Sequence, residues 1–404
     1  MGAHPHRADA VRGKVELAEV FARHGAGYCE THALVPAQHR AVRAIEACRS
    51  ERLGGHLAQC DACGELRYHY HSCRNRHCPK CQTLAKERWL AARRAELLPV
   101  RYFHLVFTLP HKLNALAQGN PREIYALLFE AVSATLLEFG ANRRWLGGEI
   151  AASLILHTWG QTLTEHLHLH GLIAAGALGP EGRWIHPKRG FLFPVKALSP
   201  VFRAKFLAGL RRALDSGALA FQGSTVELAQ RVPRSRFLAD LRAKPWVVYA
   251  KRPLGGPEQV LDYLGRYTHR VAIANNRLLS LDDAQVRFRY KDYAHGNRHK
   301  VMCLAAPEFI RRFLLHILPT GFMRIRHYGL LANRAKAEKL AAARAALNAP
   351  VPTMNTKPES LEAFYLRTTG RDIHQCPRCT IGRMIVIAPI QPTRSSPTPR
   401  AQSP

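Results

Sequence analysis

Two short stretches of the sequence hold residue types that could carry out phosphate chemistry together. One reads His166-Leu-His168-Leu-His170, and the other holds Tyr263 and Tyr267, four positions apart. A tyrosine hydroxyl can act as a nucleophile, but its pKa of about 10 makes it weak at neutral pH. A metal ion that polarises the attacked phosphate would make such an attack feasible. Histidine is a common metal ligand, so the two stretches are chemically complementary.

The histidine stretch has the alternation of a β-strand. Side chains on a strand alternate between its faces, so His166, His168 and His170 are expected on one side and the two intervening leucines in the core. Three imidazoles on one face favour a metal site over a solvent-facing strand that happens to carry histidines. Ligand softness alone would favour zinc or manganese, because imidazole is a poor ligand for magnesium.

The tyrosine stretch has the spacing of a helix that begins near Pro257, behind two glycines. Tyr263 and Tyr267 then share one face, and Arg266 and Arg270 occupy the adjacent face. The alternative, an ordinary packing pair of aromatic residues, is the better interpretation of this stretch alone. It loses that advantage when the histidine strand is considered with it.

Cysteine pairs predict a separate zinc-binding module. Two Cys-x-x-Cys knuckles, fourteen residues apart, can close a four-sulfur cage around zinc. The expected ligands are Cys60, Cys63, Cys78 and Cys81, with Cys73 or His77 as alternates for one of them. The arginines between the knuckles, Arg74 and Arg76, suit contact with phosphates. A further knuckle, Cys376-Pro-Arg-Cys379, is only half a site, and metal binding there stays open.

Composition favours a polyanionic partner. The 404 residues include 59 Lys+Arg against 29 Asp+Glu, a formal net charge of +30. Such an excess favours nucleic acid first and an anionic membrane surface second. No run of about 18 apolar residues predicts a membrane span, and the start has no apolar signal-peptide core. Paired cysteines in this spacing indicate reduced, zinc-bound thiols, which fits a cytoplasmic protein.

The order of elements predicts an α+β fold with an antiparallel sheet flanked by helices. Strands are expected over residues 101–109, 149–159, 165–174 and 245–250, and helices over 121–139 and 201–219. Four segments follow from this pattern. They are a basic helical lead-in (1–50), a zinc-binding DNA-recognition domain (51–98), a catalytic domain (99–348) and a mostly disordered tail (349–404).

Several motifs together resemble the zinc-finger, two-tyrosine HUH transposases of rolling-circle insertion sequences, the IS91 type. They are His166-Leu-His168-Leu-His170-Gly171, Tyr263-Leu-Gly-Arg-Tyr267-Thr-His-Arg270 and Cys73-Arg-Asn-Arg-His-Cys78-Pro-Lys-Cys81. The similarity covers roughly residues 40–335, in the order typical of that family. One departure is Leu167, where the family commonly has proline.

The resemblance implies a mechanism and assigns roles. It makes His168 and His170 the core ligands of a catalytic Mg²⁺ or Mn²⁺ ion, with His166 as a neighbour. A third ligand is expected among Gln161, His157 and Glu258. One tyrosine would attack single-stranded DNA at an element end, leaving a 5′-phosphotyrosine, and the second would allow strand transfer.

The zinc module would help to recognise the DNA ends, and no organic cofactor is expected. The alternatives are a rolling-circle replication initiator with the same chemistry and a non-catalytic zinc protein that binds nucleic acid. The oligomeric state stays open.

Overall fold

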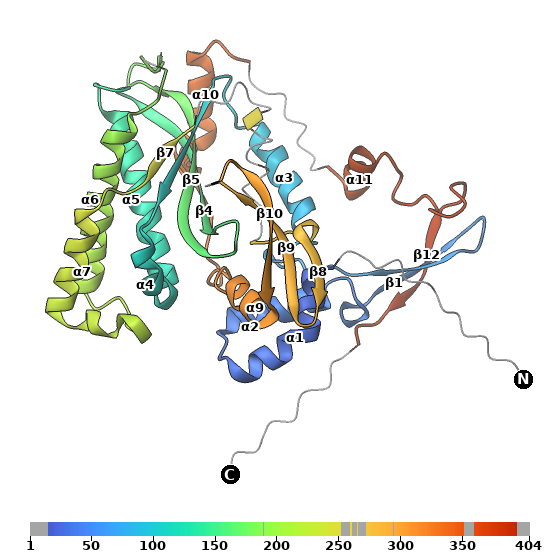
Figure 1. Cartoon of the computed structure of the whole chain (residues 1–404). Helices are drawn as coiled ribbons and strands as arrows, with labels where there is room; N and C mark the ends of the chain where they lie inside the picture. Colours follow the sequence, from blue (N-terminus) through green and yellow to red (C-terminus); the bar gives the residue numbers. More distant parts are fainter. Residues whose placement is uncertain are drawn as a thin grey trace, which may run out of the picture.

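The computed structural model describes residues 15–188, 190–251, 259–260, 265, 272–293, 295–350 and 359–393 (Figure 1). Helices and antiparallel sheets alternate along the chain, so the predicted α+β class is confirmed. Short 3-10 turns occur at Glu51–Leu53, His111–Leu113, Gly223–Ala229, Asn275–Arg277 and Asn333–Ala335.

The central sheet has the strand order β11-β4-β5-β3-β7, and every neighbouring pair is antiparallel. Its strands are β3 (Tyr102–Thr108), β4 (Glu149–Trp159), β5 (Glu165–Leu178), β7 (Val248–Ala250) and β11 (Ile325–Gly329), and β6 (Trp184–Ile185) pairs with β5. The predicted strand over 149–159 and the hairpin that joins it to β5 are confirmed. The strand β5, which carries the histidines, is central and hydrogen-bonded on both edges.

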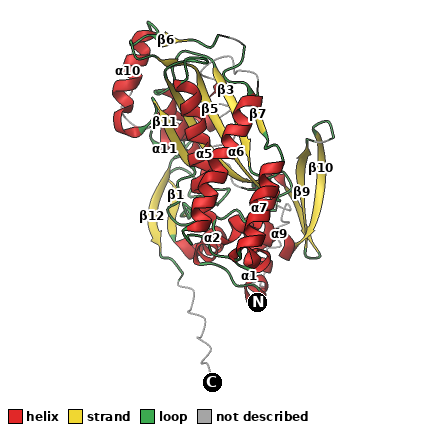
Figure 2. Cartoon of the chain, turned by 90° about the vertical axis from the view of Figure 1, so that its left-hand side faces the viewer, coloured by secondary structure: helices red, strands yellow, loops and turns green. Residues whose placement is uncertain are grey.

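Helices cover one face of this sheet, and α5, α6 and α7 lie over it in Figure 2. The helices on this face are α4 (Asn114–Gly119), α5 (Pro121–Ala141), α6 (Val195–Asp215) and α7 (Arg231–Ala243). The odd-numbered residues of β5, including Leu167 and Leu169, are fully buried against these helices. Helix α5 is long and apolar enough to cross a membrane, but 61% of its apolar window is buried inside the protein. It is therefore explained as the core helix of this layer.

The opposite face of the sheet carries the even-numbered residues of β5, and within the described ranges fewer helices cover it. Helices α3 (Gln82–Arg94) and α10 (Lys336–Ala346) lie on this side. Leu340 of α10 packs in one buried cluster with Ile155 and Leu172 of the sheet. This cluster ends beside the histidines, so their face is partly roofed by helices.

A third layer joins the start of the chain to residues from its second half. Helices α1 (Leu17–Thr31) and α2 (Pro36–Ala47) pack on α9 (Ala306–Leu314). The three-stranded sheet of β8 (Leu278–Asp282), β9 (Gln285–Asp292) and β10 (Arg298–Ala305) belongs to the same layer. The rings of Phe21 and Phe313 lie 5.5 Å apart. The lead-in predicted over 1–50 therefore does not stand apart.

Two strands from residues 55–70 and one from residues 384–390 form a small sheet, with the strand order β12-β1-β2. Its strands are β1 (Gly55–Cys60), β2 (Leu66–Tyr70) and β12 (Met384–Ile390), and helix α11 (Leu361–Thr369) precedes β12. Blue β1 and red β12 lie side by side at the right of Figure 1. The structure therefore differs from the prediction of a mostly disordered tail. Pairing with a strand some 330 residues away leaves no trace in local composition.

Candidate functional site

Three histidines converge on the sparsely covered face of the central sheet. His168 and His170 follow one another on β5, and His157 on β4 lies directly opposite His168. One ring nitrogen from each lies within 4.8 Å of the others. All three side chains are buried, with exposed fractions of 3% for His157 and 8% for the other two. Such a group can hold one metal ion and leave coordination positions open.

Hydrogen bonds orient the rings of this group. His168 Nδ1 lies 2.8 Å from the His166 carbonyl, which can only accept, so this nitrogen carries a proton. His168 Nε2 then offers its lone pair to His170 Nε2, 3.2 Å away. His170 Nδ1 lies 2.9 Å from Nε2 of His104, a buried residue of β3. An ion held by the two Nε2 atoms would leave each Nδ1 fixed by a protein group, as is usual for metal-binding histidines.

The electrostatics of the group favour neutral imidazoles, which is the form that binds metals. Burial lowers the pKa of His168 to about 3 and that of His104 to about 3. Burial, with the neighbouring His157, also holds the pKa of His170 well below its usual value. At neutral pH the rings of His168, His104 and His170 therefore each carry a single proton and keep one unprotonated nitrogen.

His166, predicted on the same face as a neighbour of the core ligands and a candidate third histidine, lies outside the converging group. His166 is half-buried, and its ring lies 4.7 Å from that of His168, but its nitrogens do not join the converging group. His157 instead faces both members of the pair, with its ring centroid 5.5 Å from that of His168 and 4.5 Å from that of His170. Of the three candidates for the third position, His157 is the one that the structure brings to the pair. The backbone carbonyl of Gln161 accepts a hydrogen bond from Arg277. Glu258 lies outside the described residues.

Trp159 lies between the converging histidines and His316. Its ring stacks on that of His157, with centroids 4.8 Å apart and planes at 14°. Its other neighbour, His316, lies 5.9 Å away and is buried. His316 Nε2 donates to the Leu163 carbonyl at 3.1 Å, so Nδ1 accepts from the hydroxyl of Thr158 at 3.1 Å. The neutral His316 ring thus stabilises the turn between β4 and β5 through these two hydrogen bonds.

Stability should depend on pH through His316. Burial lowers its pKa to about 4, below the value of about 6.5 in an unfolded chain. The stabilisation is complete above pH 6.5 and is lost as pH falls towards about 4, by roughly 3 kcal/mol. The measurement is the free energy of unfolding against pH for the native chain and His316→Gln, whose amide can still donate to Leu163. Parallel curves for the two proteins would contradict this role.

Eight of the ten cysteines form two groups of four. The first group is Cys48, Cys73, Cys78 and Cys81. Its sulfur atoms lie 3.5 Å apart for Cys48 and Cys81, and 3.6 Å apart for Cys73 and Cys81. Burial raises the pKa of Cys48 to about 11, whereas the hydrogen bond with Cys78 lowers the pKa of Cys73 to about 5. The four thiols can all ionise only around a cation.

The second group is Cys60, Cys63, Cys376 and Cys379. The predicted cage of Cys60, Cys63, Cys78 and Cys81 is therefore corrected, because each knuckle finds different partners. Cys73 is a member of the first group, not an alternate, while half-buried His77 joins neither. Cys48 was missed because it is a single cysteine at the end of α2, without the spacing of a knuckle.

The predicted DNA-contacting arginines have different surroundings. Arg76 is half-buried and donates to the carbonyls of Phe322 at 2.6 Å and Pro319 at 3.0 Å, so its role is structural. Arg74 is exposed, with a φ of 54°, and lines an open groove. Four further predicted residues, Tyr263, Tyr267, Arg266 and Arg270, lie outside the described residues.

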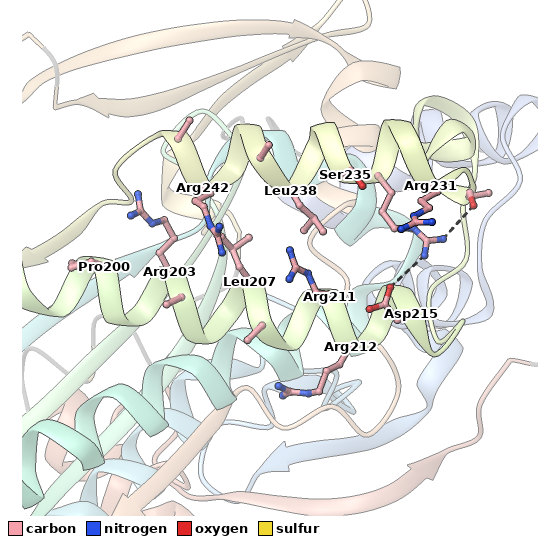
Figure 3. A pocket seen from close by; sticks show the side chains of 16 residues that line it. Pro200, Arg203, Leu207, Arg211, Arg212, Asp215, Arg231, Ser235, Leu238 and Arg242 are labelled. Atoms are coloured by element: carbon pink, nitrogen blue, oxygen red, sulfur yellow. Dashed lines mark hydrogen bonds and ion pairs between the residues drawn. The ribbon is translucent and has the colours of Figure 1, made fainter.

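A groove between α6 and α7, the arginine groove, was not predicted from sequence. Its charged lining is Arg203, Arg211, Arg212, Arg231, Arg234, Arg242 and Asp215. It has a volume of about 1100 Å³, and Figure 3 shows Arg211 and Arg242 projecting into the space between the helices. Arg234 is held there by Asp215, 3.7 Å away. Six guanidinium groups against one carboxylate suit a phosphate backbone.

Comparisons with known proteins agree on one class. The sequence profile described as "Putative transposase" matches residues 152–339, and that of a "Transposase zinc-binding domain" matches residues 20–109. The "Putative transposase y4qJ" of Sinorhizobium fredii (strain NBRC 101917 / NGR234) is 50% identical over 93% of this chain and 96% of its own length. The protein class is therefore a transposase with a zinc-binding domain.

A second relative is a transposase of an insertion sequence. The "Transposase for insertion sequence element IS801" of Pseudomonas savastanoi pv. phaseolicola is 28% identical over 76% of this chain and 73% of its own length. The chain belongs to the IS91-type transposase family. A solved structure of "Conjugative Relaxase TrwC in complex with OriT Dna" covers 35% of this chain and 71% of its own, at 15% identity and a TM-score of 0.24.

Proposed function

We propose that this transposase cuts and rejoins single-stranded DNA at the ends of a rolling-circle insertion sequence, through 5′-phosphotyrosine links to Tyr263 and Tyr267. The observation that carries the proposal is the convergence of His157, His168 and His170 on one face of the central sheet. Their neutral nitrogens fit a divalent ion, Mg²⁺ or Mn²⁺, which would polarise the scissile phosphate. With the ion on His170 Nε2, the proton of that ring would lie on Nδ1, and His104 would orient the ring by accepting from it.

The described neighbours of the tyrosines support their placement on the same face. Val260 is fully buried in the cluster that contains Ile155, the direct partner of His170 across the sheet. Tyr263 and Tyr267 come three and seven positions after Val260, and a helix would present all three on one side. A Cβ added to Gly265 would lie 3.0 Å from Leu90 Cδ1 of α3, so this part of the chain approaches α3.

The proposed reaction balances without an oxidant, a reductant or a nucleotide. A tyrosine oxygen bonds to phosphorus, the bond from phosphorus to the 3′ oxygen breaks, and that oxygen leaves as a 3′-hydroxyl after taking up a proton. The phosphotyrosine retains the energy of the phosphodiester, so a later attack by a DNA 3′-hydroxyl rejoins the strand. The second tyrosine permits another cleavage while the first link persists.

The test is a covalent adduct. The full chain, incubated with a single-stranded oligonucleotide of an element end and Mg²⁺ or Mn²⁺, should give a protein–DNA species that survives denaturation. The DNA fragment that remains bound to the protein should be the one that bears the 5′-phosphate at the cut. No adduct with any end sequence would refute the proposal, and activity only at a plasmid or phage origin would favour a replication initiator. Acting on bacterial DNA, the protein would work in the cytoplasm.

The arginine groove should contribute to DNA affinity on the sheet face away from the histidines. Replacing Arg211 and Arg242 with alanine removes two cations for which the described part of the chain offers no ion pair. If each contacts one phosphate, the slope of log K against log salt should become shallower by about 1.5. The measurement is equilibrium binding to a labelled oligonucleotide across a salt series.

The matched control is Arg23→Ala on α1, which removes a cation paired with Glu19. It should leave the slope close to that of the native chain. Equal slopes for the native chain and the groove variant would show that DNA does not enter the arginine groove.

A further inference from the structure

We propose that Cys60, Cys63, Cys376 and Cys379 form a second structural zinc site, which joins the turn after β1 to the segment before β12. We call it the clasp. Zinc held by four sulfurs at about 2.3 Å separates those sulfurs by about 3.8 Å. Here Cys60 and Cys379 lie 3.6 Å apart, and Cys63 and Cys376 lie 3.8 Å apart. These distances fit a metal cage and exceed a disulfide bond of about 2.05 Å.

The backbone around the sulfurs is arranged as in a pair of facing knuckles. The amide of Cys63 points to the sulfur of Cys60 at 3.5 Å, and the amide of Gly382 points to that of Cys379 at 3.3 Å. Such N–H groups stabilise thiolates, the form that binds zinc. In each half, the amide three residues after a cysteine points to that cysteine's sulfur, although more than 300 residues separate the halves in sequence.

Glycine permits the two knuckles to approach each other. A Cβ on Gly382 would lie 2.5 Å from the sulfur of Cys60 and 2.6 Å from the Cβ of Ala62. The amide of Arg383 donates to the Asp61 carboxylate at 2.8 Å, and the amide of Asp61 donates to the Arg383 carbonyl at 3.1 Å. The knuckles are therefore closely fitted to each other, not merely adjacent.

The clasp is needed because the small sheet lacks a core of its own. Among the described residues, none of β1, β2, α11 and β12 belongs to the three buried hydrophobic clusters. Ile385, Val386 and Ile387 of β12 are each more than half exposed. A three-stranded sheet without an apolar core needs another source of stability, and a zinc cage is the common one in small modules. The first cysteine group differs, because Cys48 and Cys78 lie inside a hydrophobic cluster.

The clasp also builds a basic groove, which we call the clasp groove. It has a volume of about 1540 Å³ and lies between β2, the start of α3 and helix α11. Its cations are Arg49, Arg67, Arg74, Lys80, Arg88 and Arg371, and its aromatic residues include Tyr68, Tyr70 and Tyr365. Cations and stacking rings together suit single-stranded DNA. This second role rests on the proposed function, whereas the zinc site does not.

The matched profiles cover only one half of this site. They span residues 20–109 and 152–339, so they contain Cys60 and Cys63 but neither Cys376 nor Cys379. Residues 20–109 hold six of the eight cysteines that form the two groups, which is two short of filling both cages.

Zinc content of the purified full chain tests the clasp. The native chain should hold about two zinc ions, and Cys376→Ser/Cys379→Ser about one. Cys60→Ser/Cys63→Ser should also lose about one, and the fourfold variant no more than either pair, because both pairs serve one ion. Cys303→Ser, an exposed thiol of β10, is the matched control and should retain the native content.

Native zinc content in Cys376→Ser/Cys379→Ser would overturn the proposal, and so would losses that add in the fourfold variant. Gly382→Val keeps every thiol, and it should lower zinc content to that of the serine variants by separating the knuckles. Oligonucleotide binding to the same proteins tests the clasp groove separately. Zinc loss with native DNA affinity would support the clasp and refute the groove, leaving the cleavage proposal untouched.

Discussion

Replacing His157 with alanine is expected to reduce single-strand cleavage by about 10³-fold or more. A metal that stabilises charge on the scissile phosphate supplies several kcal/mol, and each 1.36 kcal/mol is tenfold in rate. His170→Ala should have a similar effect, since both rings belong to the converging group. The measurement is the single-turnover cleavage rate at saturating DNA and a fixed Mn²⁺ concentration.

His166→Ala is the matched control, because it also removes a histidine from β5. Its ring lies beside the group without joining it, so cleavage should stay within about tenfold of the native rate. His104→Ala should weaken metal affinity by about 10- to 100-fold, and higher Mn²⁺ should restore its activity. A severe loss in His166→Ala with little effect in His157→Ala would reverse our assignment of the ligands.

Cys78→Ser is expected to remove one zinc ion and to unfold the third layer, which contains α1, α2 and α9. This sulfur is buried within the cluster that joins α1, α2 and α9. Structural zinc sites contribute about 10 kcal/mol or more of apparent free energy, which is comparable with the stability of a whole domain. The measurements are zinc content, thermal unfolding and near-ultraviolet circular dichroism.

Cys29→Ser is the control for this change, because Cys29 is a half-buried thiol outside both cysteine groups. It should retain the native zinc content and unfold within a few degrees of the native chain. Unchanged zinc content in Cys78→Ser would refute the first cage. A stable Cys78→Ser protein that lacks one zinc ion would instead show that packing alone holds this layer.

Predictions from the sequence were most accurate for features that depend on a single strand. The alternation of histidine and leucine predicts the burial of Leu167 and Leu169, and the structure confirms it. The strand over 149–159 was also predicted with its observed bounds. Period-two patterns are local, so they can be seen without knowledge of the tertiary contacts.

The parts that sequence reasoning missed depend on contacts between distant residues. His157 becomes a neighbour of His168 through strand pairing, and Cys48 joins its group because α2 ends beside the knuckle of Cys78 and Cys81. Local spacing instead paired two knuckles that are near in sequence but separate in the fold. Helix α11 and strand β12 were missed for the same reason, because their partners lie at the other end of the chain.

The most direct test of the account is to locate the DNA within the covalent adduct. After cleavage of a single-stranded element end, the protein should be digested and the peptide that carries the nucleotide sequenced by mass spectrometry. The account predicts a phosphotyrosine link at Tyr263 or Tyr267, and no adduct in Tyr263→Phe/Tyr267→Phe despite native zinc content and DNA affinity. An adduct on any other residue, or one that persists in the double variant, would contradict it.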